Sequence, residues 1–262
     1  MGYMLPVITI HNLFKRYGNG DWVLNGIDLE INPGQVIGYI GPNGAGKSTT
    51  VKILIGLIPE YEGEISILGL DPHKDLLAIK SQIGYIPENA ELYDVLTPME
   101  YLQFIGGLYN LPENTVNERA MKMLDSFGLR MHAHNRMDTF SKGMRQKVLI
   151  ISGLIHNPKI IFMDEPLSGL DANAVIIVKE IISRLAAEGK TIFYCSHMMD
   201  VVEKVSDRII LINNGRIIAD GPFAELQKQA EGKSLENIFA QLTGHNDLDD
   251  IAGQFLNAFE NE

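Results

Sequence analysis

The pattern of apolar and polar positions divides the chain into a strand-rich start, a helical middle and a second strand-rich part. Residues 6–18 and 22–34 are short β-rich runs broken by Gly, Asn and Asp, as in antiparallel hairpins. Compact apolar runs that we interpret as further strands follow at 35–40, 63–69 and 81–88. The apolar run 51–58 has the length and character of a helix that follows the first of these strands.

The pattern changes to helical after Glu88. In residues 96–110, Thr97 is a helix N-cap, Pro98 takes the first helical position and Glu100 completes a capping box. A second helix is predicted over residues 114–128, ending at a glycine. We therefore expect residues 89–140 to be a helical insert without strands.

Alternation of strand and helix resumes after the insert. Residues 159–166 form an apolar strand with polar residues at its C-terminal end, residues 172–189 a helix, and residues 191–197 another strand. Residues 208–221 predict a hairpin with Asn-Gly at its turn. The last thirty or so residues are helical in pattern and acidic, with Leu248, Ile251, Phe255 and Phe259 on one predicted helix face.

The composition is that of an ordinary globular protein and excludes only a few classes of function. The chain has 262 residues, 45% of them apolar, a net charge of −11 and a single cysteine, Cys195. The negative charge argues against a nucleic-acid groove, and one cysteine excludes an internal disulfide. The start of the chain does not read as a signal peptide, and no apolar run reaches the ~18 residues of a membrane span. We therefore expect a cytoplasmic location, with any role at a membrane depending on a partner.

The segment "GPNGAGKST", residues 41–49, predicts a phosphate-binding loop. Its glycines let backbone N–H groups wrap an anion, and the start of the following helix adds positive charge. Lys47 can reach phosphate oxygens, and the hydroxyl of Ser48 can bind Mg²⁺. The predicted nucleotide contacts of this loop are Gly41, Pro42, Asn43, Gly44, Ala45, Gly46, Lys47, Ser48 and Thr49.

Two carboxylates end the predicted strand "IIFMDEP". Asp164 lies at the C-terminal end of the strand, where α/β sheets bind ligands, and is a candidate Mg²⁺ ligand. Glu165 comes next and can activate a water as general base. His197 ends the neighbouring predicted strand, and we expect its imidazole within reach of a γ-phosphate. Together with the phosphate loop, these residues predict a hydrolytic site.

The segment "TFSKGMRQK" predicts a helix start suited to an anion. Ser141 is a good N-cap, Gly143 allows close approach, and Lys142 and Arg145 add charge where the helix dipole is already positive. These residues alone favour an ordinary capped helix, because capped helices are common, and the rest of the chain has to decide.

The ordered set of motifs resembles the ATP-binding subunit of ABC transporters over about residues 7–229. The motifs that carry the resemblance are "GPNGAGKST", "IGYIPE", "FSKGM", "IIFMDEP", "SGLD" and "SH". The resemblance implies an α/β fold: a P-loop NTPase core with an antiparallel β subdomain and an inserted helical subdomain. Its expected parts are a core of residues 1–88 and 141–230, the helical subdomain 89–140 and a C-terminal helical extension 231–262.

The resemblance also implies roles for several residues and an arrangement of subunits. Tyr17 would stack on adenine. Two subunits would pair head to tail around two ATP molecules, with Ser141 and Gly143 of one capping the γ-phosphate bound by the other. Asp171 would lie at the same interface. A separate membrane-spanning permease would complete the transporter, and would hold this subunit at the inner face of the membrane.

Two departures from the family pattern bear on these roles. Lys142 replaces a glycine and Met144 a glutamine in the signature segment, whereas the anion-contacting pair is kept. Glu88 stands where the family usually has a glutamine that senses Mg²⁺, and a carboxylate can still approach the metal. This glutamate, with the "FSKGM" signature, resembles a bacterial exporter branch that includes drug-efflux and gliding-motility ATPases.

Other functions remain as alternatives at this stage. A soluble ABC ATPase of the iron–sulfur assembly type is not separated by the sequence, and one of the repair type would carry a longer insertion. A GTPase switch is disfavoured because the Asn-Lys-x-Asp guanine motif is missing. For the transporter reading, we expect Tyr93 and Leu96 to line a groove for the membrane subunit. The tail after Gly244 is expected to be a packing or partner element outside the nucleotide site.

Overall fold

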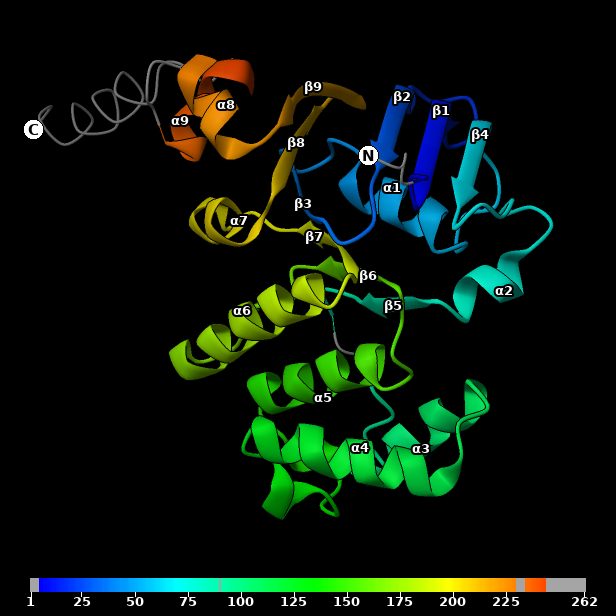
Figure 1. Ribbon diagram of the computed structural model, residues 1–262, viewed down its shortest axis with the longest axis vertical. Coiled ribbons are helices and arrows are strands. Elements are labelled where there is room, and N and C mark those ends of the chain that lie inside the picture. The colour runs from blue at the N-terminus through cyan, green and yellow to red at the C-terminus, as the bar shows by residue number, and fades with distance from the viewer. Residues whose placement is uncertain (1–4, 90, 230–233, 244–262) are drawn as a thin grey trace, which may run out of the picture.

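The computed structural model describes residues 5–89, 91–229 and 234–243. Figure 1 shows a helical part, with α3 and α4, at one end of the molecule and the C-terminal helices α8 and α9 at the other. Between them lie two sheets. The predicted tail face from Leu248 to Phe259 lies outside the described residues.

The three-stranded sheet has the order β2-β1-β4, with antiparallel pairing of β1 with both neighbours. The predicted first hairpin is therefore confirmed. Alternating burial along these strands places one face against the core, as expected for an antiparallel sheet with one solvated face. The strands are β1 (Ile8–Arg16), β2 (Trp22–Ile31) and β4 (Glu62–Ile67).

The larger sheet has six strands in the order β5-β6-β7-β3-β8-β9. All neighbours are parallel except β8 and β9, which form a hairpin around Asn214 and Gly215, both with positive φ. That turn confirms the predicted Asn-Gly hairpin. The strands are β3 (Val36–Ile40), β5 (Ile83–Ile86), β6 (Ile160–Asp164), β7 (Thr191–Cys195), β8 (Arg208–Asn213) and β9 (Arg216–Gly221).

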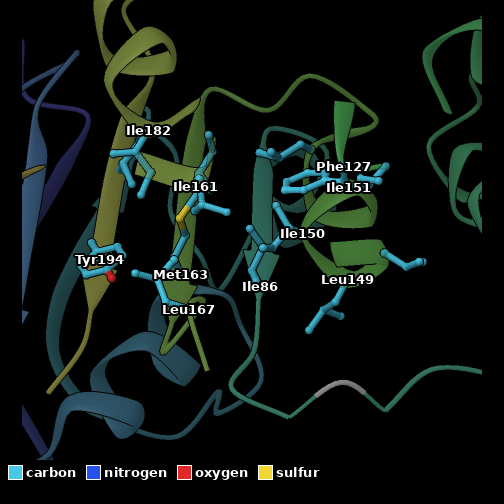
Figure 2. Packing of buried hydrophobic residues seen from close by; sticks show 14 of the residues in the cluster. Ile86, Phe127, Leu149, Ile150, Ile151, Ile161, Met163, Leu167, Ile182 and Tyr194 are labelled. Atoms are coloured by element: carbon cyan, nitrogen blue, oxygen red, sulfur yellow. The ribbon is translucent and has the colours of Figure 1, made fainter. Parts of the chain in front are cut away.

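The central parallel strands β3, β6 and β7 are buried along their whole length because both faces of the sheet are covered. On one face, Ile160 and Phe162 of β6 pack with α1 (Lys47–Leu54) and the antiparallel sheet. On the other face, Ile161 and Met163 pack toward α5 (Lys142–Leu154), as Figure 2 shows.

Capping residues mark the start or the end of several of the other helices. Thr97 caps α3 with both hydrogen bonds of the predicted capping box, and positive-φ glycines follow α4 and α6. The short helices α2 and α7 were not foreseen from the sequence. The helices are α2 (Leu76–Lys80), α3 (Pro98–Leu108), α4 (Glu113–Ser126), α6 (Ala172–Ala187), α7 (Met199–Val205), α8 (Phe223–Gln229) and α9 (Leu235–Thr243), with 3₁₀ turns η1 (Arg130–His132) and η2 (Met137–Thr139).

The described part of the region beyond residue 230 packs on the rest of the molecule. Leu235 and Ile238 of α9 are buried and join the same apolar cluster as the helices beneath the sheet. In the described residues 91–139, helices and 3₁₀ turns are present and strands are not. No helix among the described residues is long and apolar enough to cross a membrane.

Candidate functional site

The loop of residues 41–49 joins the C-terminal end of β3 to the start of α1. Gly44 and Gly46 have φ of 81° and 111°, a conformation that side chains with a Cβ rarely adopt. A Cβ on Gly46 would also lie 2.6 Å from a methyl of Leu24, and one on Gly41 would lie 2.2 Å from the carbonyl of Ile212. The glycines are therefore required by the fold of the loop itself.

Lys47 and Ser48 open helix α1. The Lys47 ammonium donates to the carbonyls of Gly41 (2.7 Å) and Pro42 (3.1 Å), which holds its charge on the loop. The Ser48 hydroxyl lies 3.4 Å from Oδ2 of Asp164, at the end of β6. Residues that are over one hundred positions apart in the chain thus meet at one edge of the sheet.

Asp164 is buried, with 8% of its surface exposed. Burial raises the pKa of its carboxyl group, and the nearby negative charges of Glu165 and Glu88 raise it further. Ser48, Glu88 and Asp164 line one cavity of about 700 Å³ between the core and the helical part. The pair of Ser48 and Asp164 offers the oxygen donors that a hard divalent cation prefers.

Glu165 has a left-handed backbone, with φ of 48°. This conformation costs roughly 1–3 kcal/mol for a residue with a long side chain, and such strain clusters at functional sites. Its N–H donates to the carbonyl of Cys195 on β7 (2.9 Å). Its carboxylate accepts from the Ser196 hydroxyl (2.9 Å) and the His197 N–H (2.7 Å), which aim the group along the strand ends.

His197 lies beside Glu165, as the predicted pairing of the two strands requires, because β6 and β7 are parallel neighbours. Its Nδ1 is 2.8 Å from Oε1 of Glu165, while 77% of the side chain is exposed. The ring is thus anchored at one nitrogen by the carboxylate and open to solvent elsewhere. Ser196, which sequence reasoning did not single out, completes the holder of Glu165, and its position after an apolar strand was the available signal.

Tyr17 follows β1, in the turn of the β1–β2 hairpin. About half of its side chain is exposed, and its hydroxyl lies 3.5 Å from that of Thr49. The Lys15 ammonium lies 5.2 Å from the centre of the ring. The ring is therefore fixed beside the loop on one side and open on the other.

Ser141 caps α5 by accepting a hydrogen bond from the Met144 N–H (3.2 Å). Asp171 caps α6 through the Ala174 N–H, and its pKa is lowered first by that hydrogen bond and then by Lys147. Among the described residues, no hydrogen bond or ion pair joins Ser141 or Asp171 to the phosphate loop of the same chain. The structure joins the phosphate loop to Asp164 through Ser48, and Glu165 to His197 through its carboxylate.

Gly143 has a role in packing that the sequence did not reveal. A Cβ at this position would lie 2.7 Å from the carbonyl oxygen of Gly169. The helix and the loop that follows Glu165 can approach this closely only because position 143 is glycine. The preference for glycine therefore has a cause within the single chain, besides any contact with a ligand.

The cavity beside Glu88 adjoins Tyr93, one of the two residues predicted to line a groove for the membrane subunit, and that groove stays a prediction. Its aromatic and aliphatic lining includes Tyr101, Ile105 and Leu108 of α3 beside residues of the core, and neither Tyr93 nor Leu96 is part of the lining. Tyr93 is 60% exposed and packs edge-on against Tyr101, whereas Leu96 is half-buried against the core. Tyr93 is accessible beside the cavity, and Leu96 is mainly a packing residue.

Comparisons with known proteins agree with this geometry. Residues 24–168, more than half of the chain, match the family described as "ABC transporter". The linearmycin resistance ATP-binding protein LnrL of Bacillus subtilis is 35% identical over 229 residues, which are 87% of this chain and 73% of that protein.

Two solved structures have the same fold. The ATP-binding subunit of an ABC transporter superposes with a TM-score of 0.85 and 32% identity, covering 90% of this chain and 99% of the other. A dimeric ATP-binding cassette in a post-hydrolysis state with ADP and Pi gives a TM-score of 0.75 and 26% identity, covering 82% and 98%. The chain therefore belongs to the ABC transporter family and is one of its ATP-binding, ATP-hydrolysing subunits.

Proposed function

We propose that the chain hydrolyses MgATP at the edge of the sheet where β3, β6 and β7 end, and that this drives export through a separate membrane subunit. The observation that carries the proposal is the strained Glu165, held by Ser196 and His197 directly after the buried Asp164. A general base must be aimed before the reaction, and two donors fix this carboxylate.

Phosphate binding falls to the backbone of residues 41–49 and to Lys47. Ser48 and Asp164 would hold Mg²⁺, with Glu88 reaching it directly or through water from the same cavity. The metal fits because Asp164 is a buried carboxylate next to two others, and a cation offsets their repulsion. When bound, Mg²⁺ supplies neutralisation of charge on the β- and γ-phosphates.

The remaining steps belong to this chain's side chains. Glu165 orients a water and accepts its proton, while the exposed His197 ring reaches toward the γ-phosphate. Tyr17 offers a ring face to adenine at the open side of the loop. The identity of these groups as catalytic or binding residues rests on their placement around Asp164 and the phosphate loop.

A second copy or a related subunit would complete the site. Within the described part of the chain, no hydrogen bond or ion pair joins Ser141 or Gly143 to the phosphate loop of their own chain, which supports their use as a cap for the nucleotide of the partner. Asp171, at the start of α6, would lie along the same contact. The dimeric cassette with bound ADP and Pi is the comparison that supports such pairing.

The cavity between α3 and the core is the proposed docking site of the membrane subunit, and it would hold this chain at the inner face of the membrane. Its lining combines Tyr101, Ile105 and Leu108 with the carboxylates of Glu88 and Glu91. The similarity to a drug-resistance ATP-binding protein favours export as the direction. No observation favours the iron–sulfur assembly type.

The test is Glu165→Gln, whose amide is nearly isosteric but cannot accept a proton. ATP hydrolysis should fall by about 10²–10⁴-fold while ATP binding persists. Because both nucleotides then stay in place, the variant should form an ATP-dependent dimer, measured by light scattering at high protein concentration. Hydrolysis at the wild-type rate would disprove the general-base role. Lys47→Ala is the contrast, since it should weaken ATP binding itself.

A further inference from the structure

One face of α5 packs against the loop that follows Glu165, residues 166–171. Positions 142, 143, 146 and 147 lie on the same side of the helix, because their spacing matches its turn. Three of them contact the loop through polar groups: Lys142 Nζ donates to the Ser168 hydroxyl (3.2 Å), Gln146 Nε2 to the Pro166 carbonyl (3.1 Å), and Lys147 Nζ to Oδ2 of Asp171 (3.1 Å).

The fourth contact is the close approach of Gly143 to the Gly169 carbonyl. The aliphatic part of Lys142 also lies over Gly169, since a Cβ there would be 3.0 Å from both Cγ and Cδ of the lysine. Gln146 is buried, with 1% exposed, so its hydrogen bond to the Pro166 carbonyl lies in the packed interior of the protein. The start of α5 and residues 166–171 therefore form one packed unit.

This unit reaches the proposed general base through the backbone. The Ser168 N–H donates to the carbonyl of Glu165 (3.1 Å), so that Ser168 closes the turn that Glu165 begins. The path from the Lys142 ammonium to Glu165 consists of two hydrogen bonds, both through Ser168. A displacement of the start of α5 must be absorbed by this turn.

Lys142 differs from the other cations on α5. Arg145 forms two hydrogen bonds of 2.7 Å with the Asp94 carboxylate, and Lys147 pairs with Asp171. Within the described ranges, Lys142 has the Ser168 hydroxyl as its hydrogen-bond partner and no carboxylate within ion-pair distance. A cation in the first turn of a helix opposes its dipole at a cost of about 0.3–1 kcal/mol. The lysine is therefore not explained by the stability of its helix.

We propose that Lys142 is a positioning residue that couples the start of α5 to Glu165 within one chain. The inference rests on the proposed function, in which the start of α5 faces the nucleotide of the opposite subunit. Contact with that nucleotide shifts Ser141 and Lys142, the lysine carries Ser168 with it, and the turn sets the aim of Glu165 in its own site. The two ATP sites of the pair thereby sense one another.

The test is a double-mutant cycle of Lys142→Met and Ser168→Ala in the assembled transporter. Methionine keeps an aliphatic stem over Gly169 and removes the donor. Each single variant should lower kcat for ATP about 2- to 30-fold with KM unchanged, and the double variant should lose no more than either single one. Lys142→Arg should restore most of the rate because it still donates. Lys122→Met, on the exposed side of α4, is the matched control and should behave as wild type.

A wild-type kcat in Lys142→Met, or losses that multiply in the double variant, would overturn the coupling. If the wild-type assembly itself shows no ATP turnover, the proposed function fails instead. The coupling is then decided by amide hydrogen exchange in the isolated chain. Lys142→Met should speed exchange at Ser168, whose N–H closes the turn, and unchanged exchange there would disprove the link.

Discussion

At the scale of single residues, the site is built by side chains that hydrogen bonds from neighbouring strand ends hold in place. Glu165 is the clearest case, because its backbone strain is offset by hydrogen bonds from the neighbouring strand end. A strained residue that is held from its own N–H and from both carboxylate oxygens has one orientation available. Pre-organisation of this kind is what a general base needs before substrate arrives.

Tyr17 allows a direct test of the proposed adenine contact. Tyr17→Ala should weaken ATP binding by about 1–3 kcal/mol, roughly 5- to 150-fold in Kd, because a base–aromatic stack is lost. Tyr17→Phe keeps the ring and loses only the long contact of 3.5 Å to Thr49, so its Kd should stay close to wild type. Titration with a fluorescent ATP analogue measures both. Equal weakening in the two variants would point to the hydroxyl and contradict stacking.

Sequence reasoning succeeded at this scale where chemistry is local and failed where it depends on packing. The phosphate loop, Asp164 and Glu165 are recognisable because a motif carries its own geometry. The contact of Gly143 with Gly169 was invisible, since it joins a helix start to a loop 26 residues later. Ser196 was missed for a similar reason: its hydroxyl matters only because β6 and β7 are neighbours.

At the scale of elements, caps and apolar periodicity decided most of the fold. The strands of the parallel sheet are continuous apolar runs, and the helices between them have clear starts. The two short helices α2 and α7 have five and seven residues and lack a side-chain hydrogen bond at the N-cap. With no cap signal and barely two turns, the sequence offers no periodicity to detect.

The capping box of α3 makes a prediction about stability and pH. Thr97→Ala should destabilise the protein by about 0.5–2 kcal/mol, measured by urea unfolding, because the Glu100 N–H loses its acceptor. The pKa of Glu100 is lowered first by the hydrogen bond from the Thr97 backbone and then by its hydroxyl. Because the pKa of Glu100 is lower in the folded protein, its carboxylate stabilises the fold at pH values above the ordinary carboxyl pKa. This stabilisation is lost as the pH falls through the lowered pKa of the folded state.

The pH dependence of the stability provides a second check on the capping box of α3. Between the ordinary carboxyl pKa near 4.5 and the lowered value, the contribution of Glu100 to folding should decline with acidification. Glu100→Gln should remove this part of the acid sensitivity. At neutral pH, its free energy of unfolding should be close to that of a protein in which the N-cap of α3 is weakened. A Glu100 carboxyl that titrates at its ordinary pKa by NMR would contradict the capping box.

At the scale of the whole molecule, the junction between the helical part and the core is the important feature. The helical part is joined to the core through the Arg145–Asp94 pair and the apolar cluster around α5, and the cavity beside Glu88 lies along this junction. Figure 2 shows Ile150 of α5 beside Ile86 of β5, and Ile151 beside Phe127, which follows α4. A subunit that docks in the cavity therefore touches both the helical part and the strand that leads to Glu88.

Two exposed side chains allow a test that distinguishes the proposed docking cavity from the neighbouring surface around Tyr93. Leu108→Glu places a charge on the cavity lining, whereas Tyr93→Glu places one on the neighbouring surface. Both residues are more than half exposed, so neither change should disturb the core, and nucleotide affinity should be unchanged. Leu108→Glu should abolish binding to the membrane subunit, because a buried unpaired carboxylate in an interface costs several kcal/mol. Co-purification with that subunit and substrate transport measure the effect. Loss of binding with Tyr93→Glu alone would place the docking surface where the sequence first suggested, and retention in both variants would exclude this end of the molecule as the contact.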